Sequence, residues 1–119
     1  MKRIFFALLG LAAFSLPAAA FDISGKYVAK GTNFDGSTYE GTAEIAKLSN
    51  TTCVVVWKIA GREYDGICMK NKDGFAAAYE MDGQVGLLLY RMEADGSLEG
   101  TWTITGERGA GTEVLIPAN

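Results

Sequence analysis

Two stretches of the chain alternate strictly between apolar and polar residues. In residues 97–104 every even-numbered position, from Leu98 to Ile104, is apolar or glycine, and every odd-numbered position is polar. Residues 38–45 repeat the pattern, with the apolar and glycine positions running from Tyr39 to Ile45. A period of two is typical of a β-strand that buries one face and exposes the other to water. The pattern therefore predicts strands and not helices in both stretches.

Turn-forming residues divide the chain after residue 20 into short segments. Asp-Gly steps at 35–36, 73–74, 82–83 and 95–96 provide most of these turns. The segments between turns are rich in β-branched and aromatic residues, and lie near 24–31, 37–47, 51–60, 62–70, 74–80, 84–93, 97–105 and 111–116. Because such short connections join antiparallel neighbours, these segments predict a meander. The predicted fold is all-β, an eight-stranded antiparallel up-and-down meander that closes as a small β-barrel.

The hairpin around Ala60-Gly61 predicts a disulfide between neighbouring strands. If the turn is centred there, Cys53 lies opposite Cys68, and Trp57 lies opposite Tyr64. The same register brings two opposite charges together, so three kinds of cross-strand pair agree on it. Paired strands hold their Cα atoms within the range that a disulfide tolerates. A redox or catalytic pair is the alternative, although the spacing of fifteen residues is not that of a C-x-x-C motif.

The hairpin at residues 75–92 carries apolar residues on both faces. A turn at Asp82-Gly83 places Phe75, Tyr79 and Tyr90 on the inner face. The outer face then carries small or aliphatic residues: Ala76, Ala78, Val85, Leu87 and Leu89. An apolar outer face is unusual for a soluble monomer. Either the 106–111 loop or the C-terminus covers it, or it is the surface for a protein partner or for self-association.

Aromatic residues recur at positions that the alternation assigns to the barrel interior. They are Tyr27, Tyr39, Trp57, Tyr64, Tyr79, Tyr90 and Trp102. Eight-stranded barrels are narrow enough for side chains alone to fill, although some hold one small ligand. These residues therefore form either a filled core, in which both tryptophans are buried, or the lining of a ligand cavity.

The first twenty residues have the features of a signal peptide. Lys2 and Arg3 precede eleven uncharged residues, and Ala18 and Ala20 fit the small-x-small rule for cleavage between Ala20 and Phe21. The apolar run is shorter than the roughly 20 residues of an ordinary membrane-spanning helix, which disfavours the alternative of a retained anchor. We expect residues 1–20 to be removed and residues 21–119 to form one domain, periplasmic or secreted, with no membrane span.

Composition restricts the chemistry that this domain can perform. The chain contains no His, which removes Ser-His-Asp and Cys-His sites and His-ligated zinc or haem. The Asp-Gly steps lack the further acidic positions of a calcium loop, and neighbouring carboxylates fall mainly on solvent faces. The sequence therefore predicts no catalytic residue, no metal site and no cofactor.

Net charge argues against nucleic acid as a partner. Removing residues 1–20 leaves nine basic and fourteen acidic residues, a net charge of −5. Nucleic acids and anionic lipid surfaces require a basic footprint. A basic protein partner is compatible with this charge but is not required by it.

Short motifs along the chain resemble known families of small barrels. The segment from Ile23 to Tyr27 resembles the opening Gly-x-Trp strand of the avidin and lipocalin (calycin-like) barrels, with Tyr27 at the Trp position. The biotin ligands of avidin have no match here. A wider resemblance is to a family of small exported proteobacterial β-barrel proteins, and it rests on Gly25-Lys26-Tyr27, Trp57, Tyr64-Asp65-Gly66, Leu98-Glu99-Gly100-Thr101-Trp102 and Gly111-Thr112-Glu113. The resemblance implies an exported barrel and brings no activity with it.

Three functions remain open on these grounds. The first is an exported, non-catalytic binding module that engages a protein partner, as a surface antigen or adhesin does. The second is a lipocalin-like or avidin-like carrier of a small ligand. The third is an inhibitor of a basic hydrolase such as lysozyme, which the export signal, the acidic charge and the small disulfide-bearing barrel would fit.

Overall fold

The computed structural model describes residues 22–118, which form eight β-strands. Their bounds are β1 Gly25–Thr32, β2 Thr38–Lys47, β3 Thr52–Ile59, β4 Arg62–Asn71, β5 Gly74–Met81, β6 Gln84–Met92, β7 Leu98–Ile104 and β8 Gly111–Pro117. The predicted signal peptide and its cleavage site lie outside the described residues. Within residues 22–118 no helix has the length and hydropathy needed to cross a membrane.

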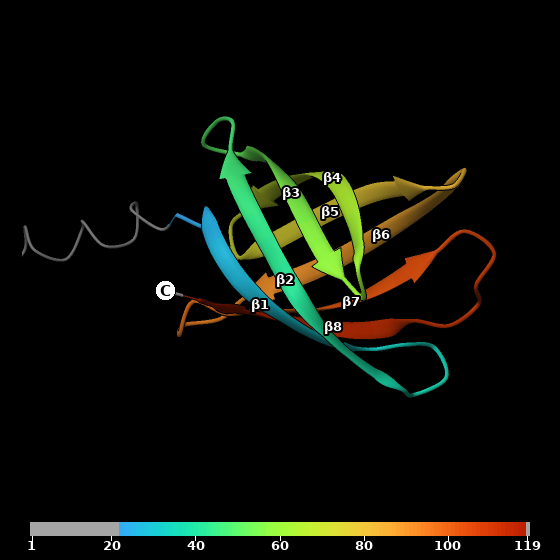
Figure 1. Cartoon of the computed structure of the whole chain (residues 1–119). Helices are drawn as coiled ribbons and strands as arrows, with labels where there is room; N and C mark the ends of the chain where they lie inside the picture. The colour runs from blue at the N-terminus through green and yellow to red at the C-terminus, as the bar shows by residue number, and fades with distance from the viewer. Residues whose placement is uncertain (1–21, 119) are drawn as a thin grey trace, which may run out of the picture.

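Each strand pairs antiparallel with the next one along the chain, and β8 pairs with β1 to close the barrel (Figure 1). The closing register runs from Tyr27 opposite Pro117 to Thr32 opposite Thr112. Closure satisfies the backbone donors and acceptors that an open sheet would leave at its two edges. The predicted eight-stranded meander is confirmed.

The two hairpin registers predicted from the sequence are also confirmed. Cys53 lies opposite Cys68 on β3 and β4, and the two form a disulfide with their Cα atoms 5.0 Å apart. On β5 and β6, Phe75 lies opposite Tyr90. Asp82 and Gly83 both have positive φ, as the two-residue turns typical of β-hairpins require. The disulfide closes a fifteen-residue loop, which stabilises the fold by about 3 kcal/mol in the chain-entropy description.

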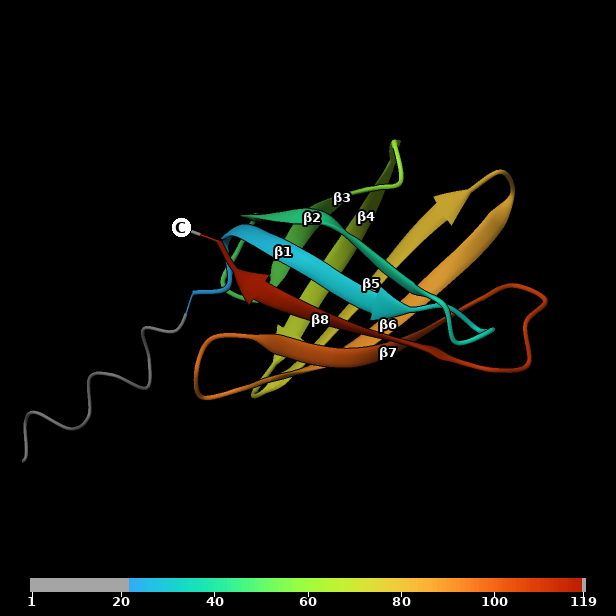
Figure 2. The same ribbon diagram turned by 60° about the horizontal axis from the view of Figure 1, so that its bottom comes forward.

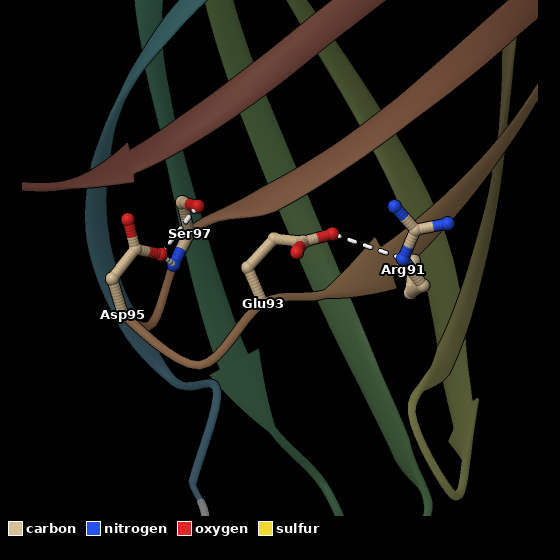
Figure 3. A network of polar contacts seen from close by, with 4 residues as sticks. All are labelled: Arg91, Glu93, Asp95 and Ser97. Atoms are coloured by element: carbon tan, nitrogen blue, oxygen red, sulfur yellow. Dashed lines mark hydrogen bonds and ion pairs between the residues drawn. The ribbon is translucent and has the colours of Figure 1, made fainter.

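The β1–β2 and β6–β7 connections use the same loop chemistry. In the β6–β7 loop the Ser97 backbone N–H and hydroxyl both donate to Asp95 Oδ1, at 2.9 and 2.7 Å (Figure 3). The corresponding bonds in the other loop join Ser37 to Asp35, at 3.0 and 2.6 Å. The repeated Asp-Gly-Ser sequence thus reflects reuse of one turn, in which the aspartate fixes the backbone two residues later.

The two halves of the barrel interior differ in their contents. The half near the two described chain ends is filled by aliphatic and aromatic side chains, among which Ile45, Val55, Phe75, Leu98 and Leu115 are almost completely buried. Ile23 lies at this end, and its carbonyl oxygen accepts a hydrogen bond from the Tyr27 hydroxyl at 2.6 Å. The β1–β2, β3–β4, β5–β6 and β7–β8 connections lie toward the opposite end of the barrel (Figure 2).

Glycines on the inner face make room for aromatic rings from adjacent strands. A Cβ atom on Gly100 would lie 2.8 Å from the Tyr90 ring and would also collide with the Leu89 carbonyl oxygen. A Cβ atom on Gly66 would lie 3.0 Å from the Trp57 ring. The remaining pairs of this kind are Gly31 with Tyr39, Gly86 with Tyr79 and Gly111 with Trp102. Each ring therefore occupies space that a side chain on the next strand would otherwise fill.

We predict that Gly100→Ala lowers the free energy of unfolding by about 1–3 kcal/mol, because the added methyl group overpacks the interior against backbone. Gly109→Ala is the matched control, since a Cβ atom there meets nothing within 4 Å. Its effect should stay within about 0.5 kcal/mol. Urea unfolding of both variants measures the difference, and equal stabilities would show that the close approach at Gly100 is not a packing constraint.

Candidate functional site

A cavity of about 250 Å³ occupies the half of the barrel away from the described chain ends. Residues from seven strands and two turns line it: Asn33, Tyr39, Trp57, Ile59, Ala60, Tyr64, Tyr79, Leu88, Trp102 and Glu113. Asn33 and Ala60 belong to the β1–β2 and β3–β4 connections, so the cavity extends to the end of the barrel. The interior is thus neither wholly filled nor wholly hollow.

The structure divides the seven predicted interior aromatics between the cavity and the core. Tyr39, Trp57, Tyr64, Tyr79 and Trp102 line the cavity. Tyr27 and Tyr90 are buried in the core and do not line it. Trp57 is 2% exposed, as the filled-core interpretation predicts. That interpretation is wrong for Trp102, which is only partly buried because the cavity leaves part of its ring uncovered.

The cavity aromatics form two clusters of rings. Tyr79 packs against Trp57 and Tyr64, with ring centroids 5.4 and 5.5 Å away and planes tilted by about 60°. On another part of the wall, the Trp102 ring lies 4.6 Å from Phe34 and 6.2 Å from Tyr39. Such separations and tilts are typical of favourable aromatic pairs, so the clusters hold the cavity wall in a defined shape.

One carboxylate, that of Glu113 on β8, borders the cavity and is only 2% exposed. Its Oε1 accepts a hydrogen bond from the Tyr39 hydroxyl at 2.7 Å. Its Oε2 accepts one from the Tyr90 hydroxyl at 2.6 Å and one from Trp57 Nε1 at 3.1 Å. The donors come from β2, β6 and β3, so one side chain joins four strands across the interior.

Burial controls the ionisation of this network. It raises the pKa of Glu113, although the hydrogen bonds from Tyr90, Tyr39 and Trp57 act in the opposite direction. The pKa values of Tyr39 and Tyr90 are raised as well, first by burial and then by the negative charge of Glu113. Both phenols therefore keep their protons and donate to the carboxyl group across the ordinary pH range.

Sequence reasoning missed Glu113 as a site residue. Within β8 the inward positions carry Gly111, Glu113 and Leu115, while Val114 and Ile116 face outward. Both faces of this strand contain apolar residues, so alternation alone does not show which one is buried. Pairing with the neighbouring strands decides it, because Glu113 lies opposite Gly31 on β1 and Gly100 on β7.

The outer face predicted at the 75–92 hairpin is apolar and exposed. Val85, Leu87 and Leu89 on β6 are 54%, 55% and 64% exposed, and Ala76 and Ala78 between them and β4 are partly exposed. Sequence reasoning missed the contribution of β4, where Ile67 and Met69 are 69% and 53% exposed. The register aligns Ile67, Ala78 and Leu87 in one row, and Met69, Ala76 and Leu89 in the next.

No family model and no curated protein sequence matches this chain. Among solved structures, a redesigned β-barrel aligns with a TM-score of 0.68 at 20% identity, over 86% of this chain and 96% of the other. Another redesigned barrel, bound to DFHBI, aligns with a TM-score of 0.65 at 21% identity, over 83% and 98%. A variant of the fluorescent protein UnaG aligns with a TM-score of 0.53 at 11% identity, over 81% and 96%.

These neighbours establish the barrel fold and nothing finer at such low identity. They agree with the β-barrel fold that the resemblance to calycin-like barrels implies. The resemblance to an exported proteobacterial family stays a hypothesis.

We predict that Glu113 makes stability fall as pH rises. Because the folded pKa lies above the ordinary value of 4.5, the folded chain retains a proton that the unfolded chain has lost. The free energy of unfolding therefore decreases from about pH 4.5 through the folded pKa, by up to about 1.4 kcal/mol per pH unit. Glu113→Gln should lack this decrease. Urea unfolding of the parent and of the variant at a series of pH values measures the difference between the two free energies of unfolding.

Glu99→Gln is the matched control for this measurement, because Glu99 is exposed on the neighbouring strand and its loss changes the net charge equally. This control should keep the slope of the parent. An unchanged slope in Glu113→Gln would contradict the assignment.

Proposed function

We propose that this protein binds a small molecule in the barrel cavity and acts as a non-catalytic carrier. The observation that supports this most directly is a 250 Å³ cavity with five aromatic residues and one buried carboxylate on its wall, inside a barrel whose other half is filled. A cavity lined mainly by apolar and aromatic side chains, with a small number of polar groups that fix orientation, is the usual composition of a small-molecule site.

The size of the cavity limits the ligand. Small-molecule sites commonly measure about 300–1,000 Å³, and this cavity lies just below that range. A compact molecule with one or two rings fits these dimensions and the aromatic wall. The redesigned barrel bound to DFHBI is a precedent for a small ligand bound by a protein of this fold.

The residues that line the cavity support a role as a carrier and not as an enzyme. The titratable groups at the cavity are Glu113 and three tyrosines, and the chain has no His to act as a general base. Burial raises the pKa values of Tyr39 and Tyr79, so neither phenol is an activated nucleophile. We place the carrier outside the cytoplasm, in the periplasm or the medium, on the basis of the signal-peptide features of residues 1–20.

Native mass spectrometry of the protein purified from its own compartment tests this proposal. We expect a non-covalent adduct of defined mass that disappears on denaturation. Ile59→Trp, which adds bulk at the cavity wall, should lose the adduct. The matched control Val56→Trp adds the same group on the outer face of the same strand and should keep the adduct.

Two outcomes would overturn the proposal that the cavity binds a small molecule. One is the absence of an adduct from the parent and from both variants. The other is an equal adduct content in Ile59→Trp and Val56→Trp, which would place the bound molecule elsewhere.

The exposed face of β4, β5 and β6 supports a second proposal, self-association with a second copy of this chain. Ala76 and Ala78 form a groove between ridges that Ile67 and Met69 make on one side and Leu87 on the other. Such a surface is self-complementary, because a ridge of one copy fits the groove of the other across a two-fold axis. This is the partner surface that the 75–92 hairpin predicts, extended by β4. No observation favours inhibition of a basic hydrolase, and we do not propose it.

Charges at the two ends of this face agree with a two-fold arrangement. Glu80 lies opposite Val85 at one end, and Arg91 lies opposite Gly74 at the other. A two-fold axis that lies in the plane of the interface and runs across the strands brings Arg91 of one copy toward Glu80 of the partner. Opposite charges at the rim orient an interface, while the apolar centre supplies the binding energy.

We predict that the double variant Leu87→Ser and Leu89→Ser folds as stably as the parent and loses its self-association. Both side chains are more than half exposed, so their truncation removes little from the core. Analytical ultracentrifugation over a concentration series, with thermal unfolding alongside, measures both properties. The control Thr101→Ser and Thr103→Ser on the adjacent strand should associate as the parent does. A monomeric parent, or an unfolded double variant, would overturn this second proposal.

A further inference from the structure

The carboxyl group of Glu113 has capacity left for a ligand. Its two oxygens together offer about four acceptor positions, and the donors of Tyr39, Tyr90 and Trp57 use three. The side chain also borders the cavity. A ligand in the cavity therefore meets an acceptor group whose position is fixed by bonds to three other strands.

Aromatic rings surround the space in front of this carboxyl group. Tyr39, Trp57, Tyr64, Tyr79 and Trp102 all line the cavity. The faces of aromatic rings attract a cation whose centre lies within about 6 Å, and cages of such rings are the usual receptors for quaternary ammonium groups. Rings tilted by about 60° to one another, as Tyr79 is to Trp57 and Tyr64, present their faces in different directions around one space.

Among residues 22–118, the side chains that donate to Glu113 are neutral. Two phenols and an indole donate to it, and none of the three carries a positive charge. The ion pairs at Arg62–Asp82 and Arg91–Glu93 lie at the surface and involve other acids. Burial of Glu113 away from a positive charge agrees with its raised pKa. A cation in the cavity would stabilise the negative charge of Glu113, because Coulomb attraction is strong where water is excluded.

We infer that the cavity selects an organic cation, a compact ring-bearing molecule with an ammonium group directed at Glu113. This inference deepens the proposed carrier function and rests on it. A neutral molecule of the same shape would gain the apolar contacts alone. An anion would meet a second negative charge in a site of low polarity.

A pair of isosteric probes separates charge from shape. Phenyltrimethylammonium and tert-butylbenzene differ by one nitrogen for one carbon and by one positive charge, and benzenesulfonate supplies an anion of similar size. The full-length chain is expressed, and the purified protein is titrated with each probe. Binding is followed by the fluorescence of Trp57 and Trp102, both of which line the cavity. We expect phenyltrimethylammonium to bind at least tenfold more tightly than tert-butylbenzene, and benzenesulfonate to bind most weakly.

Variants locate the origin of this preference. Glu113→Gln should reduce the preference for the cation over its neutral isostere several-fold, because only the attraction of the ring faces then remains. Glu99→Gln, which removes an exposed carboxylate on the adjacent strand, should keep the preference of the parent. This control separates a local effect of Glu113 from the overall negative charge of the protein.

A pH series on the unmodified protein provides a test that needs no variant. The titratable groups that face Glu113 are Tyr39 from β2, Tyr79 from β5 and Tyr90 from β6, and the pKa of each is raised. Its register partners on β1 and β7, Gly31 and Gly100, do not titrate. Ionisation of Glu113 therefore dominates the profile at any pH below the range in which these tyrosines ionise. The affinity for phenyltrimethylammonium should fall on acidification through the pKa of Glu113, while that for tert-butylbenzene stays constant.

The outcomes distinguish this inference from the carrier proposal. Equal affinities for the cation and its isostere, or a pH-independent affinity for the cation, would overturn the inference and leave a cavity that binds by shape. Tighter binding of benzenesulfonate would overturn it as well. If no probe binds and the purified protein carries no adduct, the carrier proposal itself fails.

Discussion

Inside the barrel, aromatic rings lie over glycines on the neighbouring strands, and this packing shapes the interior. An eight-stranded barrel has room for one layer of side chains from each wall. Where the side chains are aliphatic, as at Leu98 and Leu115, they meet in the middle and fill it. In the other half the rings of Tyr39, Tyr79 and Trp102 occupy the space above Gly31, Gly86 and Gly111. Because these rings lie along the wall, the centre of that half stays open as the cavity.

Glu113 connects the filled half to the open half. Its partner Tyr90 belongs to the core, where its ring packs 5.5 Å from that of Phe75, while Tyr39 lines the cavity. A carboxylate in this position is expensive to bury, and three hydrogen bonds offset part of that penalty. A buried acid with a raised pKa beside a cavity is the pattern expected of a group that acts on a ligand.

The likeness to redesigned barrels at about 20% identity shows that many sequences reach this architecture. The function of such a barrel therefore depends on the residues in its interior and on its surface, and not on the fold itself. The cavity and the apolar outer face use alternate residues of the same strands: Leu88 points inward, whereas Leu87 and Leu89 point outward. Binding inside the barrel and association through its outer face are for this reason compatible in one molecule.

The sequence by itself determined the strands, their order and two of their registers. Turn residues fix where each strand ends, and the pairs at Cys53–Cys68 and Phe75–Tyr90 follow from two-residue turns, because local hydrogen bonding sets them. It also identified the interior aromatics but not their division between core and cavity. Only the closed tertiary structure decided that division, the inward position of Glu113 and the addition of Ile67 and Met69 to the outer face. These features depend on contacts between residues far apart in the chain. Glu113 lies 74 residues from Tyr39 and 56 from Trp57, and no alternation within one strand encodes which distant side chains will meet it.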